Sequence, residues 1–184
     1  MNAASPGAGP ASPSLLPVLV LLWLAGCAIR IPLLAIPPVI PLIHDDLHMS
    51  ETQVGLLIGM PLVMLAMAAI PGSLLIARLG VLTVAVAGLA IASLAAAARA
   101  ASIDVITLYT ATLLMGFGVA IVQPALPTLV RVWAPTRSWL ANAFATNGMV
   151  MGGALSSALT IPYMLPLVGG SWRLDMMAWA VPGL

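Results

Sequence analysis

One arginine stands inside a long hydrophobic stretch near the start of this sequence. Arg30 is the only charged residue of the run 15–43 and lies close to its middle. If this run crosses a bilayer, Arg30 lies near the midplane, where an arginine costs about 2.5–3.5 kcal/mol. The nearest polar cluster begins at His44, roughly 20 Å further along a helix, which is too far for one side chain to reach. We therefore expect Arg30 to face the interior of a helix bundle or a water-filled cavity.

The chemistry that such an arginine offers is anion binding. Its helical neighbours Gly26, Cys27, Leu33 and Leu34 carry no counter-charge, and the predicted spans contain no acid apart from Asp175 at the rim of the last. A guanidinium without a carboxylate partner can grip a carboxylate-like or linear anion through its planar fork of donors. Alternatively, Arg30 pairs with backbone carbonyls freed by the nearby prolines, or with an acid outside this chain.

Two further polar residues inside predicted spans are candidates for contact with a solute. Gln123 lies beside Pro124 and Pro127 in the fourth span, and Asn147 lies in the fifth. For both residues, an interhelical hydrogen bond that only packs the bundle is an equally good interpretation. Asn142 lies nearer the end of its span, where the packing role is favoured.

The composition defines the class of protein. Of its 184 residues, 62% are hydrophobic and only 6% are charged, whereas soluble domains carry about 25% charged residues. The sequence therefore predicts an all-α integral membrane protein surrounded by lipid. A net charge of +1 without any lysine predicts no nucleic-acid partner. One cysteine, and no visible nucleophile–base pair, phosphate loop or dinucleotide fingerprint, predict no metal, no cofactor and no enzyme.

Hydrophobic stretches of about 20 residues locate the membrane spans. Residues 1–14 predict a disordered tail, and 15–184 predict a membrane helical bundle. The predicted spans are 15–43, 54–77, 81–98, 106–130, 140–167 and an incomplete 174–184. Ser50 or Thr52 can cap the second helix. Because the last stretch is half a span, the chain looks like a truncated gene product, a fragment of an assembly or part of a longer protein.

The loops predict an orientation. Arg78, Arg131 and Arg137 fall in the even-numbered loops, while Arg99 and Arg173 fall in the odd-numbered loops. This distribution favours even loops inside and a cytoplasmic N-terminus, in a multi-pass protein of the cell (inner) membrane.

Small residues recur at four-residue spacing in two predicted spans. These rows are Gly55 and Gly59 in the second span, and Gly148, Gly152 and Ser156 in the fifth. Such rows allow helix backbones to approach closely, so both predict tight helix packing.

Five spans and the start of a sixth, joined by short loops, resemble the first six-helix half of the twelve-helix major facilitator superfamily. The loop 73–80 resembles that superfamily's signature loop, with Arg78 and Gly80 on its arginine and second glycine. The resemblance implies that these two residues belong to a conformational-switch loop. The loop departs from the pattern, because Ala77 replaces the usual aspartate and Ser73 the first glycine.

The first span is similar to that of the cyanate/nitroimidazole (CynX/NimT) transporter family. Residues 29–32 read Ile-Arg-Ile-Pro and are followed by Pro37, Pro38 and Pro41 and then by the acidic loop at Asp45. This sequence departs from the family pattern by the insertion of Ile31 between Arg30 and Pro32. The resemblance covers roughly residues 20–180.

Together these features predict a secondary-active transporter of a small anion or polar organic solute, cyanate-like, that works by alternating access. Arg30 would bind the solute, with Gln123 and Asn147 as polar partners. The expected partners are membrane lipid, the solute and a C-terminal half or second chain. With no acid inside these spans, we expect any proton-coupling residue to lie in a C-terminal half or to be absent. The alternatives are a non-transporting remnant or membrane assembly subunit, and a multidrug-type exporter, which an unpaired arginine fits poorly.

Overall fold

The computed structural model describes residues 15–183, except for the side chains of Ala68, Ala69 and Gly183. The predicted tail 1–14 lies outside the described residues. Over the described range the chain is helical, with turns and no strand. The all-α fold predicted from the composition is confirmed.

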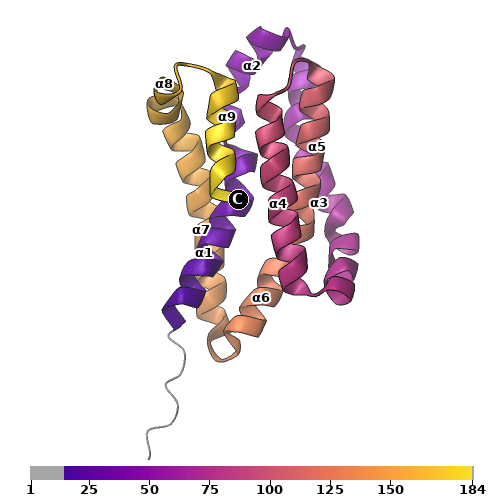
Figure 1. The fold of residues 1–184 in the computed structure, drawn as a ribbon, viewed down its shortest axis with the longest axis vertical. Coiled ribbons are helices and arrows are strands. Elements are labelled where there is room, and N and C mark those ends of the chain that lie inside the picture. The colour runs from indigo at the N-terminus through magenta and orange to yellow at the C-terminus, as the bar shows by residue number, and fades with distance from the viewer. Residues whose placement is uncertain (1–14, 184) are drawn as a thin grey trace, which may run out of the picture.

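The helices form an elongated bundle (Figure 1). Their bounds are α1 Leu15–Leu34, α2 Ile40–Leu47, α3 Glu51–Leu79, α4 Val81–Ala100, α5 Val105–Val122, α6 Ala125–Trp133, α7 Ser138–Leu159, α8 Leu165–Leu167 and α9 Trp172–Ala180. Short 3₁₀ turns cover Pro37–Val39, Pro135–Arg137 and Val181–Gly183, and Thr160–Met164 is a π-helical turn. Within the described range, four runs are long and apolar enough to cross a membrane: Leu15–Leu47, Val81–Ala100, Val105–Trp133 and Pro135–Leu167. The bent helix α3 is a fifth if its two parts count as one span.

Prolines interrupt three of these runs. The predicted first span is two helices, because Pro37 and Pro38 have no N–H to donate to the carbonyls four residues earlier. Helix α3 bends by 54° between Met67 and Ile70, where Pro71 removes the bond to the Met67 carbonyl. Pro124 separates α5 from α6 in the same way. Each break leaves backbone carbonyls that need other donors.

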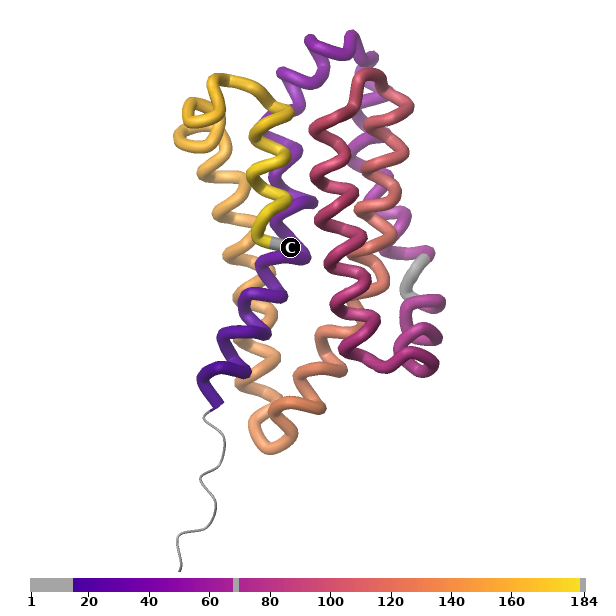
Figure 2. The backbone as a smooth tube through the Cα atoms, viewed as in Figure 1, coloured from indigo at the N-terminus to yellow at the C-terminus, as the bar shows by residue number. Residues whose placement is uncertain are grey.

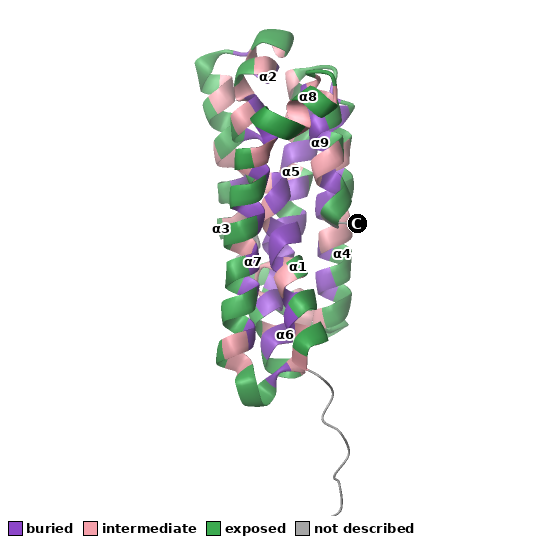
Figure 3. Cartoon of the chain, turned by 90° about the vertical axis from the view of Figure 1, so that its left-hand side faces the viewer, coloured by how far each residue is buried: buried purple, intermediate pink, exposed green. Residues whose placement is uncertain are grey.

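The core runs along the inner sides of the helices (Figure 3). Helix α1 packs chiefly against α7, α4 against α5 and α9, and α3 against α5. Figure 2 shows α9 between the α1–α7 pair and α4, with α6 linking α5 to α7 at the end of the bundle where α1 begins.

The two predicted glycine rows differ in the structure. A Cβ atom at Gly148 would overlap the backbone carbonyl of Trp23, and one at Gly152 would lie 2.6 Å from the Cα of Cys27. This row therefore brings the backbones of α1 and α7 into contact. At Gly55 and Gly59 a Cβ would have no described atom of another element within 4 Å. The prediction of tight packing at the Gly55–Gly59 row is therefore not met among the described residues.

Side chains begin the helices that follow the loops. Ser50 caps α3, since its hydroxyl accepts from the Gln53 N–H at 3.3 Å and the Gln53 side chain accepts from the Ser50 N–H at 2.8 Å. This reciprocal arrangement satisfies two N–H groups that the helix leaves free. Asp104 caps α5 in the same manner through Thr107.

The Asp104 cap should be sensitive to acid. Its carboxylate accepts from the Thr107 N–H and hydroxyl, both at 2.7 Å, and these bonds hold the pKa of Asp104 below its ordinary value. A lowered folded-state pKa stabilises the fold above the unfolded-state pKa, and this contribution is lost as the pH falls through the folded-state pKa. We expect the hydrogen-exchange protection factor of Thr107 to fall on acidification. Asp104→Ala should abolish that change and Asp45→Ala should not; equal behaviour of both variants would contradict the capping role.

Candidate functional site

Arg30 lies on the side of α1 that faces α7. Gly26, four residues earlier, meets the backbone of α7 at Ala145, and the Cys27 thiol donates to the Gly148 carbonyl at 3.1 Å. Arg30 follows these residues by four and three positions and so shares their face. The side chain is half-buried, and no described residue gives it a hydrogen bond or an ion pair.

The broken end of α1 lies directly beyond Arg30, and two other side chains bond its carbonyls. Arg99 Nη2 on α4 donates to the Pro32 carbonyl at 2.9 Å, and Ser157 Oγ on α7 donates to the Leu34 carbonyl at 2.9 Å. The sequence-based alternative, in which Arg30 pairs with freed carbonyls, therefore does not describe this structure.

The position of Arg99 differs from the sequence-based expectation. We predicted Arg99 in a loop after residue 98, but α4 continues to Ala100 and Arg99 is only 1% exposed. Its Nε and Nη1 atoms have no hydrogen-bond partner among the described residues. The helix can bury this arginine because the break in α1 provides an acceptor at the same level.

Removing the Arg99 guanidinium should loosen the α1 break rather than unfold the bundle. Arg99→Met leaves the Pro32 carbonyl without its donor, at about 1–3 kcal/mol, but it also removes a buried charge whose remaining donors are unpaired, which offsets part of that cost. We expect faster hydrogen exchange in residues 35–40 with little change in the unfolding temperature. Arg137→Met, at an exposed site, is the control. Unchanged exchange at the break would contradict a supporting role for Arg99.

Asn147 joins α7 to α1. Its Oδ1 accepts from Trp23 Nε1 at 2.9 Å, so the interhelical bond offered as an alternative role is present. Its amide N–H groups make no hydrogen bond within residues 15–183. Trp23 and Asn147, with Ala143 and Phe144, line a hollow of about 380 Å³. Trp23 and Arg30 are seven residues apart, which places them on one face, roughly 10 Å apart along the helix.

Gln123 occupies a different place, at the break between α5 and α6. It lines a hollow of about 260 Å³ with Leu65, Ala120 and Pro124. Its Oε1 atom is buried without a hydrogen-bond partner in the part of the chain that the structure describes. The structure thus brings Asn147 to the α1–α7 face that carries Arg30, while Gln123 faces α3.

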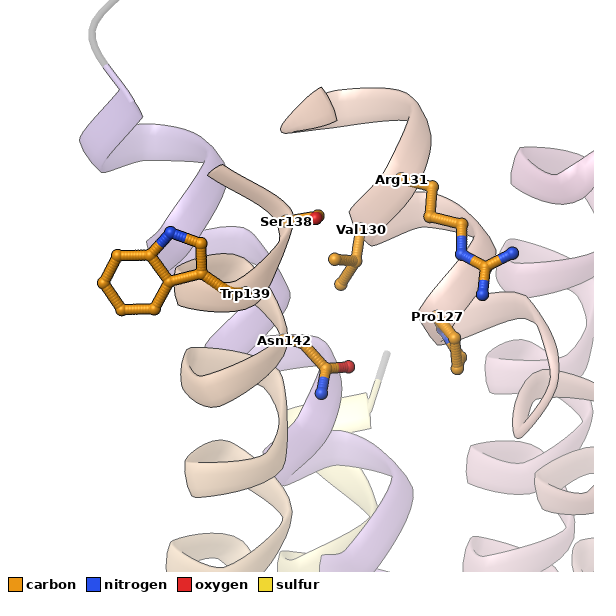
Figure 4. A pocket seen from close by; sticks show the side chains of 6 residues that line it. All are labelled: Pro127, Val130, Arg131, Ser138, Trp139 and Asn142. Atoms are coloured by element: carbon orange, nitrogen blue, oxygen red, sulfur yellow. The ribbon is translucent and has the colours of Figure 1, made fainter. Parts of the chain in front are cut away.

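A third hollow, of about 310 Å³, lies between α6 and α7 at the end of the bundle where α1 begins (Figure 4). In Figure 4 the Asn142 amide points from α7 towards α6, and the Trp139 ring points away. Ser138 and Arg131 also line this hollow. Asn142, for which we predicted a packing role, has an exposed side chain here.

Gly80 joins α3 to α4, and Arg78 lies two residues before it. Gly80 has a φ of +84°, a region that glycine adopts without the strain a Cβ would bring. Arg78 is exposed in the last turn of α3, where its charge complements the helix dipole. It bonds to no other described side chain. The conformational-switch role that the resemblance implies for Arg78 therefore has no ionic partner within the described residues.

At the opposite end of the bundle a polar cluster joins α2, α9 and the loop after α4, and no sequence pattern indicated it. Arg173 Nη1 lies 2.7 Å from Asp46 Oδ2, and Arg173 Nη2 donates to the Ser102 carbonyl at 3.2 Å. Trp172 Nε1 donates to the same Asp46 oxygen at 3.2 Å. The ion pair is substantially exposed, so it contributes little to stability by itself. Together with the bond to Ser102 it links α9 to α2 and to the loop after α4.

Comparison with known proteins assigns the family. Residues 19–184 match the family model described as the Major Facilitator Superfamily. The chain is also similar to the uncharacterized transporter YycB of Bacillus subtilis, with 28% identity over 145 residues, which are 79% of this chain and 36% of YycB. The chain thus spans little more than a third of that relative's length. Because the family model covers most of an all-α chain with several membrane-length apolar helices, the chain belongs to the Major Facilitator Superfamily, a family of membrane transport proteins and not of enzymes.

Proposed function

We propose that this chain takes part in secondary-active transport of a small anion or polar organic solute by alternating access. The observation that carries the proposal is the guanidinium of Arg30, which lies within an apolar helix run and to which no described residue bonds. Retaining a charge there is costly unless the site is wet or occupied. The similarity of the first span to the CynX/NimT family supports a cyanate-like anion.

The contrast with the other arginines supports a binding role for Arg30. Arg99 donates to the broken end of α1, and Arg173 is paired with Asp46. Arg30 alone of these three has no bond to a described residue, so its donors remain available to a solute. A planar fork of donors suits a small anion.

The α7 surface beside Arg30 provides polar groups for a solute path. Asn142, Thr146 and Asn147 are all exposed on α7, and Asn142 and Thr146 share one face because they are four residues apart. The Trp23–Asn147 hollow and the Asn142–Arg131 hollow both open along this helix. We propose that this face lines the solute path and that a second helical bundle closes its other side.

The ends of the bundle support an N-terminus in the cytoplasm and a location in the cell (inner) membrane. The loops with Arg78, Arg131 and Arg137 lie at the end where α1 begins (Figure 1). At the other end Arg99 is buried and Arg173 is paired. The exposed arginines therefore gather at one end, which the positive-inside rule places in the cytoplasm.

Uptake into proteoliposomes tests this proposal. The full chain is reconstituted and mixed with [¹⁴C]cyanate, with empty liposomes as the blank. We expect saturable uptake that excess unlabelled linear anions inhibit and that a hydrophobic cation does not. Uptake equal to that of empty liposomes would contradict the transport function, and inhibition by the hydrophobic cation alone would favour a multidrug-type exporter.

A further inference from the structure

Asp175 is an acid enclosed within the helix bundle. It lies one turn into α9 and is 0% exposed, although we expected it at the rim of the last predicted span. The Trp179 indole lies within reach of the carboxylate, but by bond geometry neither carboxylate oxygen accepts a hydrogen bond from a described residue. Trp179, four residues further on, donates to Thr160 Oγ1 at 2.9 Å. The mechanism proposed above does not use this carboxyl group.

The packing of α9 places Asp175 at the level of Arg99. Trp172 and Met176 share a buried cluster with Ala100 at the end of α4, and Ala180 shares one with Ala96. The two helices therefore run antiparallel, and Asp175 lies within about one helical turn of Arg99 along their axes.

None of the charged or titratable groups on the elements around α9 bonds to Asp175 in the described range. Helix α4 contributes Arg99, which bonds to the Pro32 carbonyl and keeps Nε and Nη1 free. Helix α9 itself contributes Arg173, which is engaged with Asp46. Helix α2 contributes His44 and Asp45 besides Asp46, α1 contributes Cys27 and Arg30, and the π-helical turn contributes Tyr163. None of these groups bonds to Asp175 in the part of the chain that the structure describes.

A carboxyl group in this setting favours its neutral form. An ionised carboxylate without a partner is costly in a buried site, whereas a protonated carboxyl costs much less. Loss of the proton to water leaves the electron pair on the carboxylate and creates a buried negative charge. This charge attracts the guanidinium of Arg99, on the helix packed against α9, away from the Pro32 carbonyl and towards Asp175.

We propose that Asp175 is a proton-binding site whose deprotonation draws Arg99 away from the broken end of α1. The site then links a proton to the segment that follows Arg30, and its use in coupled transport rests on the function proposed above. This differs from our sequence-based expectation that a coupling residue lies in a C-terminal half or is absent.

Infrared titration of the reconstituted chain tests the proton site without requiring transport. Free aspartates titrate at about pH 3.9, so a protonated-carboxyl band that persists above that range should come from Asp175. As the pH is raised, we expect such a persisting band in the unmodified chain and in Asp45→Asn, an exposed control, but not in Asp175→Asn. A band of the unmodified chain that disappears entirely in the range of free aspartates would overturn the proposal and leave Asp175 as a structural acid near the start of a helix.

Hydrogen exchange tests the link to α1. As the pH is raised through the Asp175 titration, exchange in residues 35–40, relative to the intrinsic rates, should rise several-fold in the unmodified chain. It should not rise in Asp175→Asn, in which no charge forms, and Asp175→Glu should restore the rise. A rise of the same size in Asp175→Asn would overturn the link between the two sites.

Transport separates this inference from the proposed function. Asp175→Asn should keep [¹⁴C]cyanate exchange across proteoliposome membranes but lose accumulation driven by a pH gradient, and Asp175→Glu should recover it. Accumulation by Asp175→Asn equal to that of the unmodified chain would overturn the coupling role. Failure of the unmodified chain to transport at all would instead contradict the proposed function, and the infrared result would still decide whether Asp175 binds a proton.

Discussion

Replacing Gly148 by alanine is expected to destabilise the bundle by about 3 kcal/mol, the upper end for an added methyl group in a packed interior. The new Cβ would overlap the carbonyl oxygen of Trp23. Because the obstacle is backbone, it cannot move aside by changing a rotamer, and α1 must separate from α7. The contact between these helices is the most extensive in the structure, so its loss should also shift Arg30.

The row of Gly55 and Gly59 provides the matched control. At Gly59 a Cβ has no described atom of another element within 4 Å, and alanine is the better helix former by about 1 kcal/mol. Gly59→Ala should therefore leave the chain as stable as before or slightly more stable. At Gly153 the added atom would meet the side chain of Leu34, which can adjust, so Gly153→Ala should fall between the two.

Thermal unfolding in one detergent ranks these three variants. The expected order of stability is Gly59→Ala, then Gly153→Ala, then Gly148→Ala. A Gly148→Ala variant as stable as Gly59→Ala would show that α1 and α7 do not approach as closely as described.

The second large effect is expected at Arg30. Hydrogen bonds to a charged group contribute about 1.5–3 kcal/mol, and 1.4 kcal/mol corresponds to tenfold in affinity. Arg30→Ala should therefore reduce [¹⁴C]cyanate uptake by at least about tenfold. Arg30→Lys keeps the charge but loses the planar fork, so we expect an intermediate loss.

Two controls distinguish a binding role for Arg30 from a general effect of charge or folding. Arg137→Ala removes an exposed arginine from the end of the bundle and should leave uptake unchanged. Arg30→Ala should keep the unfolding temperature of the unmodified chain, because no bond to a described residue is lost. Uptake that survives both Arg30→Ala and Arg30→Lys would exclude Arg30 as the solute site.

Local signals in the sequence were sufficient for much of the fold. Hydropathy predicted an all-α membrane protein, and Ser50 was one of the two candidate caps, with Thr52, because capping depends on local residues. The prolines near Arg30 were expected to free backbone carbonyls, and the structure shows a full helix break there. These features depend on residues that are near one another in the chain.

Features that depend on tertiary neighbours could not be predicted. The rows at Gly55 and at Gly148 have the same spacing, and only the helix that packs against each row distinguishes them. Arg99 was assigned to a loop because a charge usually ends an apolar run, but an acceptor on another helix allows its burial. The bond between Trp23 and Asn147 joins residues 124 positions apart, and no pattern in either helix indicates it.

Equilibrium binding of [¹⁴C]cyanate to the full chain in lipid nanodiscs tests the central claim, that Arg30 holds the anion, most directly. This measurement does not require the protein to complete a transport cycle. We predict saturable binding to the unmodified chain and to Arg137→Ala, at least about tenfold weaker binding to Arg30→Ala, and an intermediate affinity for Arg30→Lys. Equal affinity of Arg30→Ala and the unmodified chain would contradict the claim.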